Sequence, residues 1–193
     1  MSHPSSAPFR EFLTTAAGSI LAAAVVVATP TAAVGQEKAA DRPEADPEDV
    51  ESPDAIVSTV YEAVSGPAGE ERDWDRFRSL FLPEARLIPT FRQEGEPPYL
   101  IVDVEGFIKE YNRRIGKADF YEREVHAVTE RFGDIAHVFS TYVSSRSPHG
   151  QPFMRGINSF QLWYDDNGDR WWIVNVIWHT EREGAPIPER YGG

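Results

Sequence analysis

Two histidines and one tyrosine are the residues of this sequence best suited to catalysis in a cavity. His126 lies in the middle of "EREVHAVTER", and His179 lies near the end of "WWIVNVIWHTE". A neutral imidazole can act as a general base or bind a ligand near neutral pH. Tyr142, in "FSTYVSS", can donate its hydroxyl to an oxyanion. His126, Tyr142 and His179 are therefore candidate catalytic residues, although residues of these types are more often structural.

Two aspartates are candidate general bases. They are Asp73 and Asp103, and they are candidates because a carboxylate near an apolar cavity has a raised pKa. Each also stands just before a predicted helix, where Asp is a preferred N-cap residue. Capping is the favoured interpretation of both.

Three arginines are candidate anion-binding residues. Arg92, Arg146 and Arg155 are each able to hold a carboxylate or phosphate with two hydrogen bonds. The favoured alternative is cross-strand ion pairing with the acidic residues of the strand around His126. Those acidic residues are Glu122, Glu124 and Glu130.

The sequence shows no metal or nucleotide motif. "DDNGD", residues 165–169, resembles the start of a calcium loop, but Arg170 and Val176 stand where an EF-hand requires Gly and Glu. We interpret this segment as a hairpin turn. There is no glycine-rich phosphate loop and no nucleophile elbow. No spacing typical of zinc ligands links the histidines at positions 126, 137, 149 and 179. We expect neither a metal nor a cofactor.

Composition excludes several classes of partner. The chain has 193 residues, a formal net charge of −12 and no run of Lys or Arg. This charge argues against binding to nucleic acid or to an anionic membrane surface. No cysteine is present, so disulfides, thiolate catalysis and cysteine-bound zinc are excluded.

The charge and hydropathy pattern divides the chain into four parts. Residues 1–35 contain an arginine followed by the apolar run "AAGSILAAAVVVA" and small residues that fit a signal-peptidase site, so we expect a signal peptide. The alternative is an uncleaved anchor, although the run is short for spanning a bilayer. Residues 36–52 are charged and predicted to form a disordered acidic linker. A folded domain over 53–182 and a C-terminal tail over 183–193 complete the prediction.

Within the domain, apolar spacing predicts three helices followed by a sheet. The helices are expected at 53–65, 73–83 and 103–117, each with an N-cap residue before an apolar face. "ARLIPTF" and "YLIV" are predicted short strands. Four long strands, at 120–132, 135–146, 153–164 and 170–181, are separated by hairpin turns. This order predicts an α+β domain with an antiparallel meander.

The last strand has two apolar faces. Strict alternation places Trp172, Val174, Val176 and Trp178 on one face, and Trp171, Ile173, Asn175, Ile177 and His179 on the other. A sheet exposed to water on one side should alternate apolar and polar residues. We therefore expect helices to cover one face and a second subunit to cover the other.

Three segments together resemble the nuclear-transport-factor-2-like superfamily, which includes the SnoaL-like (polyketide-cyclase-like) proteins. They are "RDWDRFRSLFLPEARLIPTF" (72–91), "GDIAHVFSTYVSSR" (133–146) and "RGINSFQLWYDDNGDRWWIVNVIW" (155–178). The resemblance covers most of residues 53–182. It implies a cone-shaped, cystatin-like α+β fold, in which a curved mixed sheet wraps round the N-terminal helices. It also implies an apolar pocket and a homodimer formed through the sheet.

The resemblance transfers no catalytic residue, because no acid/base pair of the superfamily's enzymes matches a motif here. The expected pocket contacts are aromatic and polar residues of the predicted helices and strands. They are Trp74, Phe77, Arg92, Tyr111, His126, Tyr142, Arg155 and Trp178. The leading hypothesis is an exported, periplasmic or secreted protein that binds a small apolar molecule. The alternatives are a cofactor-independent isomerase, dehydratase or cyclase, and a protein-interaction module.

Overall fold

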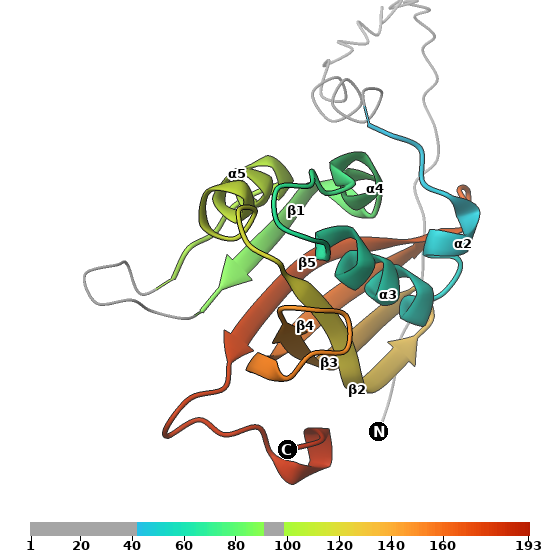
Figure 1. The fold of residues 1–193 in the computed structure, drawn as a ribbon. Helices are drawn as coiled ribbons and strands as arrows, with labels where there is room; N and C mark the ends of the chain where they lie inside the picture. Colours follow the sequence, from blue (N-terminus) through green and yellow to red (C-terminus); the bar gives the residue numbers. More distant parts are fainter. Residues whose placement is uncertain (1–41, 91–98) are drawn as a thin grey trace, which may run out of the picture. The chain divides into compact units, whose positions relative to one another are not determined.

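The computed structural model describes residues 42–90 and 99–193, which form one mixed α+β unit (Figure 1). The helices are α2 (Pro47–Val50), α3 (Pro53–Val64), α4 (Trp74–Ser79), α5 (Val104–Arg114) and the short 3₁₀ helix η1 (Glu189–Tyr191). The strands are β1 (Phe81–Pro89), β2 (Tyr121–Phe132), β3 (Ile135–Ser145), β4 (Pro152–Asp165) and β5 (Arg170–Thr180). None of the helices among the described residues is long and apolar enough to cross a membrane.

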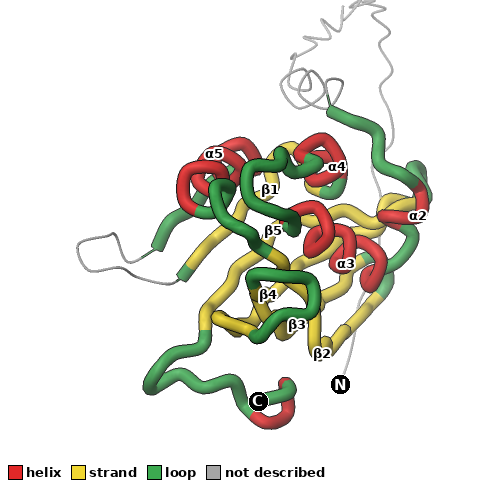
Figure 2. Tube along the Cα trace, viewed as in Figure 1, coloured by secondary structure: helices red, strands yellow, loops and turns green. Residues whose placement is uncertain are grey.

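The five strands form one curved sheet in the order β1-β5-β4-β3-β2. β2 to β5 make the predicted antiparallel meander, and β1 pairs with β5 in parallel. Helices α3, α4 and α5 lie over one face of this sheet (Figure 2). The α+β fold with a mixed sheet, predicted from the sequence, is confirmed.

Capping residues begin the three main helices where the sequence predicts. The Ser52 hydroxyl accepts a hydrogen bond from Ala55 N (3.1 Å), and Pro53 follows as the first helical residue of α3. Asp73 caps α4 by accepting from Arg76 N at 2.9 Å. Asp103 caps α5 in the same way. The capping interpretation of both aspartates is confirmed.

A β-bulge at Val125 changes which side chains of β2 face the helices. Glu124 pairs with Tyr142 of β3, whereas His126 pairs with Thr141, so Val125 has no partner in β3. A bulge adds one residue to a strand and shifts the alternation beyond it. Glu124 therefore faces the helices, and His126 lies on the outer face of the sheet.

A second bulge, at Val174, corrects the predicted faces of β5. Ile173 pairs with Leu162 and Asn175 with Gln161, which leaves Val174 without a partner in β4. The helix-facing side of β5 consequently carries Trp171, Ile173, Val176, Trp178 and Thr180. Strict alternation was wrong here, because the extra residue shifts the phase of the strand beyond Ile173 and brings Val176 and Trp178 to the helix-facing side.

Three segment predictions need correction. Residues 42–52 of the predicted linker are ordered: α2 forms within them, Val50 is buried in the core, and Asp49 pairs with Arg76 at 2.7 Å. "YLIV" forms only a single bridge, between Val102 and Leu87. The tail folds back onto the outer face of the sheet through η1 and the partly buried Tyr191. The predicted signal peptide and residues 36–41 lie outside the described residues.

Candidate functional site

A cavity of about 840 Å³ lies between the helices and the inner face of the sheet. Its walls are mostly apolar and include Val60, Phe77, Phe107, Phe120, Phe160 and Trp178. Val60, Phe77 and Phe107 come from the apolar faces of α3, α4 and α5, which point at the sheet, and Phe160 and Trp178 come from the sheet itself. A mostly apolar cavity with a few polar groups is typical of a small-molecule site.

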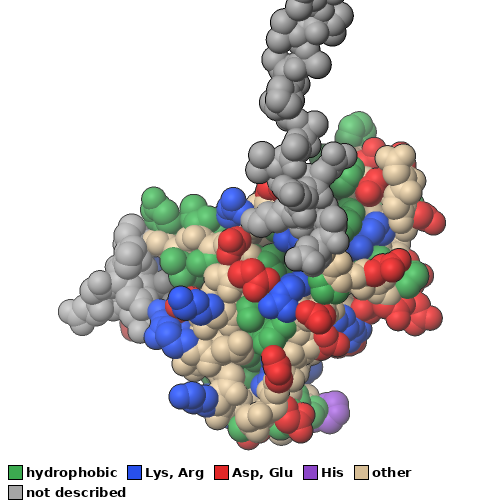
Figure 3. Space-filling view, turned by 90° about the horizontal axis from the view of Figure 1, so that it is seen from above, with side chains coloured by type: hydrophobic (Ala, Val, Ile, Leu, Met, Phe, Trp, Pro, Cys, Tyr) green, Lys and Arg blue, Asp and Glu red, His purple; other side chains and the backbone are tan. Residues whose placement is uncertain are grey.

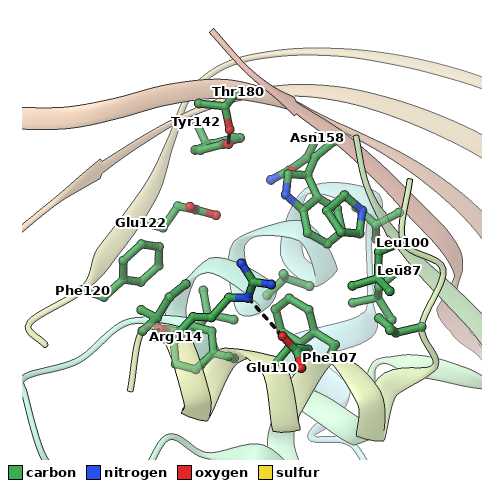
Figure 4. A pocket seen from close by; sticks show the side chains of 18 of the residues that line it. Leu87, Leu100, Phe107, Glu110, Arg114, Phe120, Glu122, Tyr142, Asn158 and Thr180 are labelled. Carbon is green, nitrogen blue, oxygen red and sulfur yellow. Dashed lines mark hydrogen bonds and ion pairs between the residues drawn. The ribbon is translucent and has the colours of Figure 1, made fainter. Parts of the chain in front are cut away.

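Four polar side chains reach this cavity, one from each of four strands. They are Glu122 of β2, Tyr142 of β3, Asn158 of β4 and Thr180 of β5. In Figure 4 the Glu122 carboxyl group points into the cavity beside Phe120, and Tyr142 and Thr180 lie together on the sheet side. Strands supply the polar groups, so their positions are held by the hydrogen-bonded ladder of the sheet.

Glu122 is the titratable group at the centre of this arrangement. Its side chain borders the cavity and is surrounded by apolar walls, and the Ser144 hydroxyl donates a hydrogen bond to it at 2.8 Å. Burial raises the pKa of Glu122 to about 7, and the bond from Ser144 only partly opposes that rise. A carboxyl group with this pKa can both accept and return a proton near neutral pH.

Tyr142 is positioned by a glycine. The residue opposite it on β4 is Gly156, and a Cβ atom there would lie 2.5 Å from the Tyr142 hydroxyl. The absence of a side chain lets the ring lie over β4, where its hydroxyl reaches Thr180 Oγ1 at 3.3 Å. Burial, and then the charge of Glu122, raise the pKa of Tyr142, so its hydroxyl remains a donor.

A hydrogen-bonded chain supports the inner wall. Asn158 Nδ2 donates to the Tyr61 hydroxyl at 3.0 Å, Tyr61 contacts Ser140 Oγ at 2.7 Å, and Ser140 donates to Glu124 at 2.5 Å. Burial raises the pKa of both Tyr61 and Glu124. The chain fixes the orientation of Asn158 at the cavity surface, because its amide donor is already committed to Tyr61.

Charged residues surround the α5 side of the cavity. Arg113 and Arg114 both pair with Glu110, at 2.6 and 3.0 Å. These two hydrogen bonds hold the pKa of Glu110 at about 2, so this carboxylate is ionised at neutral pH. Figure 4 shows Arg114 and Glu110 joined on the α5 side of the cavity, away from Tyr142 and Thr180.

Of the pocket residues predicted from the sequence, Phe77, Tyr111, Tyr142 and Trp178 line the cavity. Trp74 instead packs in the core behind it, against Phe77 and Tyr111. Its indole nitrogen is buried and has no hydrogen-bond partner among the described residues. Arg92 lies outside the described residues.

The two candidate histidines do not line the cavity. His126 lies on the outer face, where Gly192 of the C-terminal tail covers it. His179 is also on that face, with Nδ1 2.8 Å from the Thr90 hydroxyl and Nε2 accepting from Arg182 at 3.2 Å. The expectation that they point into the cone fails because it assumed unbroken alternation along β2 and β5.

The candidate anion-binding arginines differ in their positions. Arg155 is on the outer face, where it donates to the Gly192 carbonyl and lies 3.7 Å from Glu181. Arg146 does line the cavity, with its guanidinium over the Phe153 ring. Neither forms the predicted ion pair with the acidic residues of β2.

Sequence reasoning missed Glu122 as a site residue. It was assigned only to cross-strand ion pairing, because a glutamate in a strand with alternating charges resembles a solvated position. One signal was present: Glu122 is two residues from Phe120 and in phase with it, so an apolar environment could have been inferred. Within residues 42–90 and 99–193, no group of three or more acidic or histidine side chains is arranged to hold a metal ion.

The sequence matches no family model and no curated protein. Its structure is similar to that of a protein of unknown function with a cystatin-like fold from Nostoc punctiforme, at 8% identity and a TM-score of 0.51, over 65% of this chain and 86% of that one. A nuclear-transport-factor-2-like protein of unknown function from Silicibacter pomeroyi is 19% identical, with a TM-score of 0.46, over 66% and 92%. A ketosteroid isomerase-like protein from Parabacteroides distasonis is 15% identical, with a TM-score of 0.47, over 67% and 88%.

The likeness to the Nostoc protein, together with the sheet order, shows a cystatin-like fold. The fold resemblance drawn from the sequence is confirmed. At these identities the likeness concerns the fold alone, and function has to be argued from the site.

Proposed function

We propose that this protein binds a small, largely apolar molecule in the cavity between its helices and sheet. The observation that carries the proposal is the cavity of about 840 Å³, walled by aromatic and aliphatic side chains and provided with a few convergent polar groups. Filling such a space with hydrocarbon removes apolar surface from water, which supplies the driving force. Asn158, Tyr142 and Thr180 would orient a polar group of the ligand.

The direct test is to identify what occupies the cavity. The protein is purified from its native host, denatured, and its extract analysed by mass spectrometry for a stoichiometric small molecule. A Val176→Phe variant narrows the cavity, whereas Val128→Phe makes the same change on the outer face. We expect the ligand to be retained in Val128→Phe and lost in Val176→Phe. Retention by both variants, with folding confirmed by circular dichroism, would show that the ligand binds elsewhere.

A second function, proton transfer on the bound molecule, is favoured by the pKa of Glu122. The Glu122 carboxylate would take a proton from a carbon that lies between a carbonyl and a carbon–carbon double bond, and the Tyr142 hydroxyl would donate to the oxyanion of the dienolate that forms. Glu122 would then return the proton to the far carbon of the dienolate, which moves the double bond next to the carbonyl and gives a cofactor-independent isomerisation.

Solvent exchange tests this second function. With the ligand found in the extract, nuclear magnetic resonance in deuterated water should show deuterium entering the ligand only with the native protein. Glu122→Gln should stop the exchange, and Tyr142→Phe should slow it by about 10²-fold or more. Exchange at the native rate in Glu122→Gln would rule out this role, while leaving the binding function intact.

We also propose that the protein acts after export and as a homodimer. Export is supported by the signal-like residues 1–35, and N-terminal sequencing of the mature protein would test it.

The homodimer is supported by exposed apolar side chains on the outer face of the sheet. These are Ile135, Trp163 and Ile177, which are 60%, 37% and 40% exposed. Light scattering on the native chain and a Trp163→Arg variant would test it, since a monomeric native chain contradicts the proposal.

A further inference from the structure

A hydrogen-bonded chain joins a solvent-exposed carboxyl group to the wall of the cavity. At its outer end, Ser140 Oγ donates to Glu124 Oε2 at 2.5 Å. At its inner end, Asn158 Nδ2 lies 3.0 Å from the Tyr61 hydroxyl, which is 2.7 Å from Ser140 Oγ. Asn158 lines the cavity, whereas Glu124 borders a separate hollow lined by residues of α3 and β2. The chain therefore reaches the cavity wall from outside the cavity.

A count of protons fixes the direction of every hydrogen bond in this chain. An ionised carboxylate only accepts, so the single hydroxyl proton of Ser140 goes to Glu124. Ser140 Oγ then has to accept from Tyr61, which uses the single hydroxyl proton of Tyr61. The Tyr61 oxygen is left only as an acceptor, so Asn158 has to turn its nitrogen toward it. The orientation of the amide thus follows from the negative charge on Glu124.

The same count leaves the amide oxygen of Asn158 for the ligand. Oδ1 accepts no hydrogen bond from any described residue, and it is not one of the buried polar atoms that lack a partner. Because Asn158 is on the cavity wall, this oxygen is open to the cavity; Figure 4 shows the side chain on the sheet side. An acceptor beside apolar walls gains a hydrogen bond when the ligand brings a donor.

The setting of Glu124 differs from that of a fully solvated carboxylate. Figure 3 shows Asp and Glu side chains spread over the surface seen from above the helices, so exposed carboxylates are common on this molecule. Glu124 instead accepts from Ser140, whose side chain is completely buried. Without that carboxylate, the Ser140 proton would have only the Tyr61 oxygen to go to. Tyr61 would then donate to Asn158, and the amide would have to turn its nitrogen to the cavity.

We propose that Glu124 is a positioning residue, which acts through Ser140 and Tyr61 to hold the Asn158 amide oxygen toward the cavity, and that the ligand carries a hydroxyl or N–H group that donates to this oxygen. This proposal rests on the binding function proposed above and adds the polarity of the ligand's hydrogen-bonding group to it. Specificity for a donor is thereby set by a carboxylate that does not line the cavity.

A pair of probes tests the polarity of the site. 4-Cyclohexylphenol and its methyl ether, 4-cyclohexylanisole, share a ring system, but only the phenol has a proton to donate. Calorimetric titration of the full-length protein at pH 8 gives the ratio of the two affinities, and the phenol keeps its proton there because phenolic pKa values are about 10. The ratio in each variant is compared with that of the native chain, so the greater hydrophobicity of the ether cancels.

Two variants outside the cavity should change this ratio. In Glu124→Met and in Ser140→Ala the amide should turn over, and we expect the preference for the phenol to fall about fivefold or more relative to the native chain. A purely structural effect would weaken both probes alike. Glu130→Met, an exposed carboxyl group farther along β2, is the matched control and should keep the native ratio. Circular dichroism confirms that each variant is folded.

Nuclear magnetic resonance reads the amide orientation without any ligand. Nuclear Overhauser contacts between the Asn158 side-chain amide protons and the Tyr61 ring should be strong in the native chain and weak in Glu124→Met. Absence of these contacts in the native chain, or an unchanged affinity ratio in either Glu124→Met or Ser140→Ala, overturns the proposal and leaves the binding function standing. Failure of the native chain to bind either probe contradicts the binding function, and the contacts still decide whether Glu124 orients Asn158.

Discussion

Ser144 Oγ donates a hydrogen bond to Glu122 Oε2 at 2.8 Å, directly across the pairing of β2 and β3. Among the described residues this is the one hydrogen bond to that carboxyl group, and it does not offset the loss of hydration. A buried carboxyl group in this condition favours its protonated form. The relationship makes Glu122 a source of pH-dependent stability as well as the leading candidate for chemistry in the cavity.

Replacing Glu122 by Gln should remove a pH dependence of stability. The pKa of Glu122 is raised from 4.5 to about 7, so the folded state binds more protons than the unfolded state between these values. Stability from this group is therefore full at acid pH and is lost as pH rises to about 7. We expect Glu122→Gln to be about 1–3 kcal/mol more stable than the native chain near pH 8, and equal to it near pH 4. Urea unfolding at both pH values checks this, and equal stabilities near pH 8 would contradict it.

Gly156→Ala should displace Tyr142. The added Cβ would lie 2.5 Å from the Tyr142 hydroxyl and also clash with the His179 carbonyl. The backbone neighbour cannot move without disturbing the β4–β5 ladder, so we expect a loss of about 2–4 kcal/mol in unfolding free energy. Differential scanning calorimetry measures it. The double variant Gly156→Ala/Tyr142→Phe relieves only the contact with the hydroxyl, and full recovery there would show that the His179 contact contributes nothing.

Arg72→Met should destabilise the loop that follows α3. The buried Arg72 guanidinium donates to four backbone carbonyls, those of Val64, Gly66, Pro67 and Glu70, at 2.7–3.3 Å. Removing the donors leaves the Pro67 and Glu70 carbonyls without a hydrogen bond from the described residues, whereas the Val64 and Gly66 carbonyls keep those from the Tyr111 hydroxyl and Phe120 N. The loss should cost about 2–4 kcal/mol. Guanidinium unfolding checks the value, with the exposed Arg190→Met as control. A loss no larger than that of the control would show that water replaces the guanidinium.

Tyr191→Ala should loosen the C-terminal tail. The Tyr191 ring packs edge-on against Phe139 at 4.8 Å between centroids, and its carbonyl accepts from Thr141 at 2.7 Å. Losing the ring should cost about 1–2 kcal/mol. Hydrogen exchange should then become faster around His126, which the tail covers. Glu189→Ala, on the same turn, is the control, and unchanged exchange at His126 in Tyr191→Ala would show that the backbone contacts alone hold the tail.

The helices and their limits follow from local chemistry, and the sequence predicts them well. Ser52, Asp73 and Asp103 cap α3, α4 and α5 because a side-chain oxygen can satisfy a free backbone N–H within three residues. The four meander strands are also predictable, since β-branched and aromatic residues alternate between turn residues. These features depend only on neighbours in the chain.

The candidate site depends on contacts between distant residues, so only the tertiary structure decided it. A bulge at Val125 turns His126 outward, and another at Val174 brings Trp178 inward, although alternation alone predicts a different arrangement. Which residue is bulged is set by pairing with β3 and β4, not by the local sequence. The pKa of Glu122 likewise arises from walls supplied by other elements. The sequence by itself determined which segments form helices and which form strands. Three-dimensional packing determined which of their side chains meet in the cavity.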